Sequence, residues 1–221
     1  MSWHRRVNDT LRRAHLRILR YAEQTMGMSA IRHHWTADQV AELQQESRHW
    51  PRYELIEGEL IVTPAPGVEH QLAVQEFLFI LHEYVEQQRL GTVFLSPADI
   101  RLIPESIVQP DIFVVPPAVG PPLGRKAKWS DVKALVLAVE IVSPSSVRTD
   151  RLHKRDLYMR AGLPDYWVVD VDARVVEQWS SQRATPIPCV EALNWQPGGA
   201  VEPLTINLIE LFRTITGKRI L

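Results

Sequence analysis

The chain has 221 residues, 45% hydrophobic and 23% charged, with a net charge of −1 and a pI near 6.7. This composition is typical of a soluble globular protein, and without an apolar run near the roughly 20 residues that span a bilayer we expect no membrane-spanning segment. The single cysteine, Cys189, excludes an internal disulfide and a cysteine-based metal cluster, which favours a cytoplasmic location. The near-neutral charge excludes a general attraction to nucleic acid, so such binding would require a local basic patch.

Positive charge is concentrated at the start of the chain. Residues 1–27 carry six arginines against Asp9 and Glu23, a balance of +4, which leaves −5 for the remainder. Three interpretations stay open: a basic amphipathic helix that contacts nucleic acid or membrane, an organelle-targeting segment, or an extension that precedes a true start at Met28. We expect residues 1–34 to be an N-terminal extension, helical or not part of the native domain, and residues 35–221 to form a single domain.

The next part of the chain predicts a helix, a hairpin and a longer helix. Thr36 is a plausible N-cap for a short helix over 37–45. Residues 53–62 are typical of two strands joined by a tight turn at Glu57-Gly58. Residues 70–90 place apolar side chains at helical spacing, with His70 at the inward edge of the first turn. A packed or capping histidine and a site histidine are both open at that position.

Several strands and one more helix follow. Residues 91–96, 98–103 and 108–115 are strand-like, and the apolar run that starts at Ala134 predicts a strand buried on both faces. A helix over 149–161 ends at Gly162. Residues 165–171 and 175–179 predict two paired strands, and residues 204–212 a closing strand or short helix. The order favours the α/β (α+β) class: a mixed sheet flanked by helices, with an N-terminal β-hairpin.

Two of the apolar strands each carry one carboxylate, Asp111 and Glu140. A buried ionised carboxylate is costly unless a metal or a counter-charge compensates it, so the two strands could hold a divalent cation between them. Lys154 lies on the inward face of the following helix, on the side shared with Asp150 and Tyr158. Structural ion pairs are the alternative, and Asp150 is as readily an early-helix residue as a functional one.

This set of side chains suits phosphodiester hydrolysis. Mg²⁺, or Mn²⁺ in its place, binds one or two carboxylates together with water and substrate phosphate, and it activates water and the phosphoryl group. An ammonium nearby stabilises charge in the transition state, and a backbone carbonyl beside Glu140 is a further candidate ligand. A basic segment could contact nucleic-acid phosphates and stack a base on Trp129, although a solvated loop is the alternative. The cations of this basic segment are Arg125, Lys126 and Lys128.

These motifs resemble a known family. Pro110-Asp111 followed by Glu140-Ile141-Val142 resembles the PD-(D/E)XK nuclease superfamily. The fuller string resembles its Uma-two type of restriction-endonuclease-like proteins, over about residues 35–212. The matching residues are 53–60, His70, 110–111, 140–145, Asp150, Lys154, Tyr158, Gly162 and 166–170.

The resemblance implies a restriction-endonuclease-like core and Mg²⁺-dependent cleavage of DNA. It implies that Asp111 and Glu140 are catalytic metal ligands. The motif's lysine would fall at position 142, where this chain has Val142, and the resemblance implies that Lys154 supplies the lysine from the helix instead. The residues that would support the pocket are Glu54, Glu57, His70 and Tyr158.

Two classes of function stay open. The first is a metal-dependent DNA endonuclease, for which a homodimer is plausible because cutting a duplex needs two sites or two events. The second is a catalytically inactive nuclease-fold module that binds nucleic acid or a protein partner, which Val142 and the slightly acidic net charge favour. A serine hydrolase built on Ser143 lacks the G-x-S-x-G pattern and is discounted.

Overall fold

A six-stranded sheet forms the centre of the larger of two units into which the chain divides. The larger unit comprises residues 66–104 and 108–221, and the smaller comprises residues 1–65 and 105–107. The computed structural model describes residues 34–46, 50–117, 128–142, 146 and 149–217. The N-terminal segment, Arg125, Lys126 and Ser143 therefore lie outside the described residues. The division into an extension and a single domain stays a prediction.

The smaller unit contains the predicted helix and hairpin. Thr36 caps the helix reciprocally with Gln39: the Gln39 N–H donates to Thr36 Oγ1 at 3.3 Å, and the Thr36 N–H donates to Gln39 Oε1 at 2.9 Å. Glu57 and Gly58 both have positive φ, 52° and 82°, as a tight primed hairpin turn requires. Both elements are confirmed. Their bounds are α2 Ala37–Glu46, β1 Arg52–Ile56 and β2 Glu59–Thr63.

The central sheet of the larger unit has the order β3-β4-β5-β6-β7-β8. β5 and β6 run parallel, and the other neighbouring pairs are antiparallel. A separate antiparallel pair, β9 and β10, precedes the C-terminal helix. The bounds are β3 Thr92–Leu95, β4 Ile112–Val115, β5 Leu137–Ile141, β6 Asp165–Asp170, β7 Val175–Ser180, β8 Ile187–Cys189, β9 Ala192–Trp195 and β10 Leu204–Asn207.

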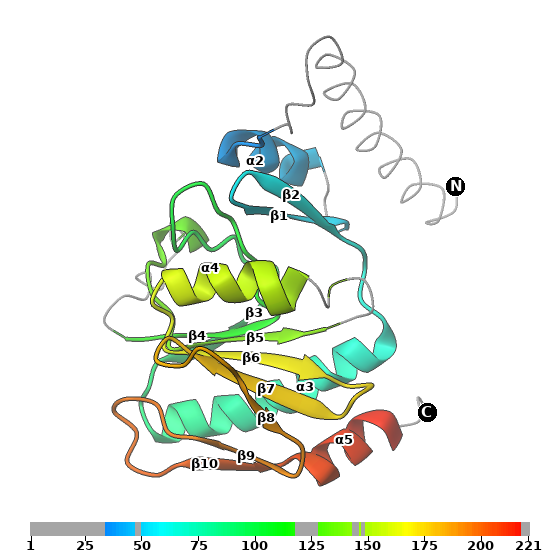
Figure 1. The fold of residues 1–221 in the computed structure, drawn as a ribbon, viewed down its shortest axis with the longest axis vertical. Helices are drawn as coiled ribbons and strands as arrows, with labels where there is room; N and C mark the ends of the chain where they lie inside the picture. The colour runs from blue at the N-terminus through cyan, green and yellow to red at the C-terminus, as the bar shows by residue number, and fades with distance from the viewer. Residues whose placement is uncertain (1–33, 47–49, 118–127, 143–145, 147–148, 218–221) are drawn as a thin grey trace. The chain divides into compact units, whose positions relative to one another are not determined.

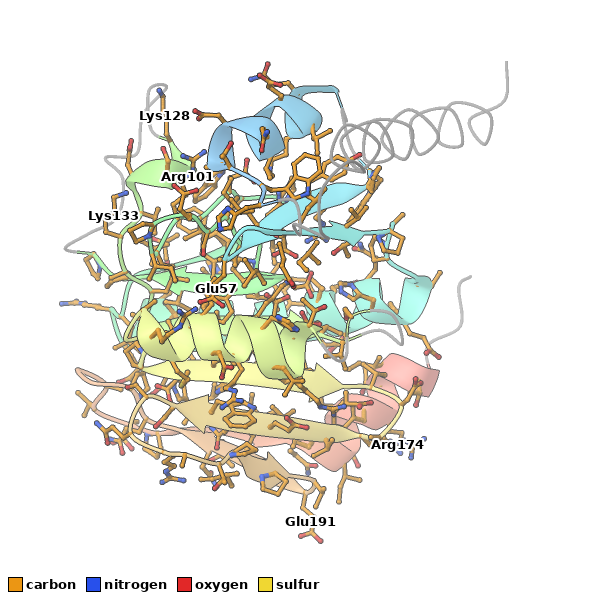
Figure 2. All side chains as sticks on the ribbon, turned by 45° about the horizontal axis from the view of Figure 1, so that its top comes forward. Glu57, Arg101, Lys128, Lys133, Arg174 and Glu191 are labelled. Atoms are coloured by element: carbon orange, nitrogen blue, oxygen red, sulfur yellow. The ribbon has the colours of Figure 1, made fainter. Side chains whose placement is uncertain are left out.

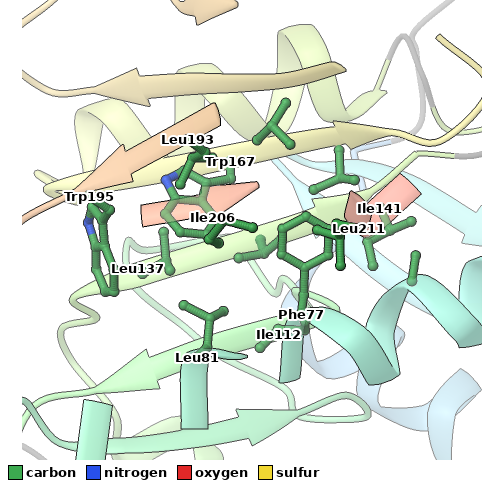
Figure 3. Close-up of a cluster of buried hydrophobic side chains, with 14 of the residues drawn as sticks. Phe77, Leu81, Ile112, Leu137, Ile141, Trp167, Leu193, Trp195, Ile206 and Leu211 are labelled. Carbon is green, nitrogen blue, oxygen red and sulfur yellow. The ribbon is translucent and has the colours of Figure 1, made fainter. Parts of the chain in front are cut away.

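Helices cover both faces of this sheet, as the sequence predicts. α3 (Val68–Gln87) and α5 (Leu208–Gly217) lie on one face, and α4 (Arg155–Arg160) lies on the other (Figure 1). Val139 and Ile141 point into the apolar core beneath α3, so Glu140 between them points toward α4. The core also packs Phe77 edge-on against Trp167 (Figure 3). Among the described helices, none combines the length and apolar character needed to cross a bilayer.

Two strand predictions are corrected by the structure. Residues 98–103 do not form a strand, although Ala98 and Ile100 are buried and Ile100 makes one isolated bridge to Val108. Polar and apolar residues alternate over 98–103 because some of these side chains are buried in a bent segment that is not a strand. The strand predicted over 108–115 begins only at Ile112, because Pro110 has no N–H to donate to a ladder. Asp111 thus lies immediately before the strand and not within it.

Other differences concern the ends of elements and the C-terminal region. The helix predicted over 149–161 begins with a π-helical turn, η2 (Thr149–Lys154), which continues into α4. Between β7 and β10 the structure contains β8 and β9, which the sequence analysis does not predict because they are too short to give a recognisable period. The closing segment is both a strand and a helix, β10 followed by α5.

The buried ring of Phe77 provides a test of the core. Phe77 is fully buried, whereas Phe79 on the same helix is 59% exposed. We expect Phe77→Ala to lower the free energy of unfolding by about 3–5 kcal/mol, and Phe79→Ala to change it by about 0.5 kcal/mol or less. Urea unfolding of the three proteins measures both effects. Equal losses in the two variants would contradict the assignment of Phe77 to the core.

A second test concerns Asp165, whose carboxylate accepts the indole N–H of Trp195 at 3.0 Å. Burial raises the pKa of Asp165, against smaller opposing effects of Trp195 and Arg183. The folded state therefore binds a proton on the Asp165 carboxyl group more tightly than the unfolded chain does. The stability that this protonation contributes is lost as pH rises from 3.8, the ordinary pKa of the group, through its raised pKa in the folded state. Asp165→Asn retains an acceptor for Trp195, so we expect its stability relative to wild type to increase over that pH range. A difference independent of pH would contradict this.

Candidate active site

The structure brings Asp111 and Glu140 to the same edge of the central sheet. Ile112 faces Val139 across the β4–β5 pair, so the next antiparallel step sets Asp111 opposite Glu140. The Ile141 N–H donates to Asp111 Oδ2 at 3.0 Å, which ties the Asp111 side chain to the end of β5. Both residues are buried, at 7% and 3% exposure. Asp111, immediately before β4, therefore lies opposite Glu140, which stands on β5 and faces α4.

Lys154 reaches this pair from the helix that follows β5. Its Nζ lies 2.9 Å from Glu140 Oε1 and 3.4 Å from Asp150 Oδ1. Lys154 and Asp150 are both almost fully buried, at 4% and 2% exposure. The ammonium thus stands between two carboxylates, one from the sheet and one from its own helix. A lysine from the helix, in place of one at Val142, can reach the acids, and its catalytic role stays a prediction.

The π-helical turn η2 carries both Asp150 and Lys154. The Asp150 N–H donates to the Ser146 carbonyl at 2.9 Å, and the Tyr166 hydroxyl donates to the Asp150 carbonyl at 2.9 Å. Burial raises the pKa of Asp150. The charge of Lys154 and a hydrogen bond from the Ser146 side chain lower this pKa, and the nearby charge of Asp111 raises it. Asp111 therefore lies close enough to Asp150 to repel it. π-Helical turns are rare and occur often at functional sites.

Two further predicted residues hydrogen-bond to the acids. The Tyr158 hydroxyl donates to Glu140 Oε1 at 3.2 Å, and its ring packs 4.8 Å from that of Tyr166. His70 Nε2 lies 3.0 Å from Asp111 Oδ2, and the histidine side chain is 14% exposed. The other ring nitrogen, Nδ1, is buried without a hydrogen-bond partner among the described residues. His70 and Tyr158 are thus placed to orient one carboxylate each.

The remaining predicted residues belong to other elements. Glu54 is buried on β1 and Glu57 is exposed at the hairpin turn, both in the smaller unit. Their contribution to the pocket stays a prediction. Lys128 is exposed at the start of the short helix η1 (Trp129–Asp131), where its side chain projects outward (Figure 2). The ring of Trp129 is half-buried and packs edge-on against Phe94 and Phe113, and its stacking on a base stays a prediction.

The charge balance of the site fits a divalent cation. Counted over these four described residues alone, Asp111, Glu140 and Asp150 carry three negative charges when ionised and Lys154 carries one positive charge, an excess of two negative charges. A bound cation or bound protons would relieve this excess. Within the described part of the chain, no three His, Cys, Asp or Glu side chains are arranged to hold a metal ion. Two carboxylates nevertheless suffice for Mg²⁺, which retains water ligands.

Asp150 is the residue that sequence reasoning undervalued. Its place in the first turn of a helix has an ordinary explanation, the favourable interaction of an acid with the helix dipole. The available signal was its spacing of four residues from Lys154, which puts both side chains on one helical face. Burial of that face became evident only from the packing of η2 and α4 on the sheet.

The mixed sheet with flanking helices, an acid pair at its edge and a lysine from the next helix define a protein of the restriction-endonuclease-like class. The model of the Uma2 family, described as "Putative restriction endonuclease", matches residues 37–204. That match spans well over half of the chain, and the chain belongs to the Uma2 family. The resemblance drawn from the motifs is confirmed.

A solved structure supports the fold. The chain is similar to the crystal structure titled as a putative nuclease belonging to DUF820 from Anabaena variabilis, with a TM-score of 0.62 and 24% identity. The similarity covers 75% of this chain and 92% of that one. At this identity the likeness establishes the fold alone, and the predicted fold class is confirmed. A comparison with curated proteins finds no match.

Lys154 is expected to stabilise the protein as the buried counter-charge. In the absence of divalent metal, Lys154→Met should lower the free energy of unfolding by about 3–5 kcal/mol, because it leaves buried carboxylates without their cation. The exposed Lys133 provides the control, and Lys133→Met should change stability by about 0.5 kcal/mol or less. The deficit of Lys154→Met should shrink at acidic pH, where protons neutralise the carboxylates. Urea unfolding at neutral and acidic pH measures this, and matching deficits in both variants would contradict it.

Proposed function

We propose that this protein is a metal-dependent endonuclease that hydrolyses phosphodiester bonds in DNA. The observation that carries the proposal is the approach of Lys154 Nζ to Glu140 Oε1, at 2.9 Å, beside a second carboxylate that is tied to the same strand end. Membership of a family described as restriction endonucleases supports the same reaction. The PD-(D/E)XK assignment and the dependence on Mg²⁺ or Mn²⁺ belong to this proposal.

Asp111 and Glu140 would hold the metal ion, because their carboxylate oxygens are hard ligands on adjacent strands. When bound, the ion supplies Lewis acidity toward the phosphoryl group and lowers the pKa of water. His70 keeps the Asp111 carboxylate oriented, and Tyr158 does the same for Glu140. Lys154 contributes a positive charge that stabilises the growing negative charge on the phosphate.

DNA is the proposed substrate, and a homodimer is a compatible assembly for cutting both strands. Lys128 is an exposed cation in the segment proposed to contact the phosphate backbone, and phosphate contacts of this kind position the duplex without reading its sequence. We propose that Arg125 and Lys126 act with it. The support of the pocket by Glu54 and Glu57, which the resemblance implies, stays a prediction.

A second function is favoured by one specific feature. Val142 occupies the position of the motif's lysine, and a nuclease-fold protein that lost this group would bind nucleic acid or a protein partner without cutting. The buried Lys154 at the acids argues for the nuclease, because retaining a charged cluster without a function costs stability.

Cleavage of supercoiled plasmid DNA tests the proposal. With Mg²⁺ or Mn²⁺, the wild-type protein should nick the plasmid, and Asp111→Asn and Glu140→Gln should each reduce the rate about 100-fold or more, since each removes charge at the metal. These substitutions retain the shape of the side chains. Asp156→Asn, an exposed carboxylate on α4, is the matched control and should keep the full rate.

The outcomes separate the two functions. Loss of nicking in both site variants, with retained folding and a retained rate in the control, would support the endonuclease. If the wild-type protein cuts with neither metal, and calorimetric titration detects no metal binding at the two acids, the nuclease proposal is wrong and the binding module replaces it.

A further inference from the structure

We propose that Asp150 is a positioning residue that holds the ammonium group of Lys154 against Glu140 for the nuclease reaction. This inference rests on the function proposed above and assigns a role within the same site. Asp150 precedes Lys154 by four positions, and its Oδ1 lies 3.4 Å from the lysine Nζ. The opposite partner, Glu140 Oε1, lies at 2.9 Å.

A lysine requires such a second partner to be held in place. Its side chain is a flexible four-carbon stem ending in a compact charge, and it carries about 2 kcal/mol of rotamer entropy. Contact with a single carboxylate fixes the distance between the ammonium and that carboxylate, but it leaves the ammonium free to move around it. Two carboxylates from different elements limit both, because the ammonium must satisfy one on β5 and one on η2 at once.

Asp150 is itself anchored to the sheet. Its carbonyl accepts the Tyr166 hydroxyl at 2.9 Å from β6, and its N–H donates to the Ser146 carbonyl at 2.9 Å. Tyr158, which donates to Glu140, packs on the ring of Tyr166. Contacts with the neighbouring strands β5 and β6 thus fix the two carboxylates that face Lys154 relative to one another. The sheet thereby fixes the position of the ammonium.

The geometry favours positioning over the two other roles for a buried acid. As a metal ligand, Asp150 would have to share its carboxylate between the ion and the ammonium of Lys154, which lies 3.4 Å from its Oδ1. As a purely structural ion pair, it would be expected to add stability. When ionised, Asp150 adds a further negative charge to a buried site that already contains the carboxylates of Asp111 and Glu140, which is unfavourable for folding. A residue that costs stability at a site is expected to contribute there to function.

The variant Asp150→Asn separates these roles, because it keeps the size of the side chain and removes its charge. In the plasmid assay we expect kcat to fall about 10- to 100-fold, the range for residues that orient a catalytic group. The KM for DNA and the Mg²⁺ affinity, measured by calorimetric titration, should be unchanged. The midpoint of thermal unfolding without metal should be equal to or above that of wild type. Asp156→Asn is the control with unchanged activity.

Combining the substitution with Lys154→Met tests whether Asp150 acts through the lysine. If it does, Asp150→Asn causes no further loss of kcat once Lys154 is absent. Multiplicative losses would overturn the proposal, as would a kcat equal to wild type in Asp150→Asn. A fall in Mg²⁺ affinity that matches the fall in kcat would also overturn it, because Asp150 would then be a ligand.

A measurement that needs no cleavage distinguishes failure of the proposed nuclease function from failure of the role proposed for Asp150. If the wild-type protein does not cut DNA, thermal unfolding without metal still reports the contact: Lys154→Met should lower the midpoint less in the Asp150→Asn background than in wild type. Equal decreases in the two backgrounds would show that the residues are not coupled, and the proposal would be wrong. Should Lys154→Met not fold, Lys154→Arg serves in the same cycle, because its planar group does not fit the same two contacts.

Discussion

The contact of one buried ammonium with two buried carboxylates, beside a third, is the interaction around which the larger unit is organised. Lys154 contacts Glu140 and Asp150 directly, and Asp111 is close enough to raise the pKa of Asp150. Such a cluster is unfavourable for folding unless each charge has partners. Tyr158 and the Ile141 N–H supply partners for Glu140 and Asp111. The proposed divalent cation would compensate negative charge among these carboxylates.

The sheet keeps this polar cluster apart from the apolar core by alternation alone. Successive side chains on a strand point to opposite faces, so Glu140 faces α4 while its neighbours Val139 and Ile141 enter the core beneath α3. Stability and chemistry are thereby assigned to opposite faces of one strand. This explains how a strand that is buried along its whole length carries an acid without disturbing the packing around Phe77 and Trp167.

Local signals predicted the elements that have strong local causes. The Glu57-Gly58 turn, the long amphipathic helix α3 and the helix end at Gly162 each follow from backbone preference or periodicity, and all are present. Elements without such causes were missed. The strands β8 and β9 span three and four residues and depend on their partners for hydrogen bonds, while residues 98–103 alternate in polarity without a neighbouring strand to pair with.

The sequence by itself determined the family, the fold class and the candidate site residues Asp111, Glu140 and Lys154. Charged residues within apolar runs and the order of the motifs can both be recognised without a structure. Tertiary structure alone decided which of them meet. The register of β4 on β5 sets Asp111 opposite Glu140, and the docking of η2 and α4 buries Asp150 beside Lys154. The importance of Asp150 depends on burial and on distances between separate elements, and spacing along one helix does not specify either.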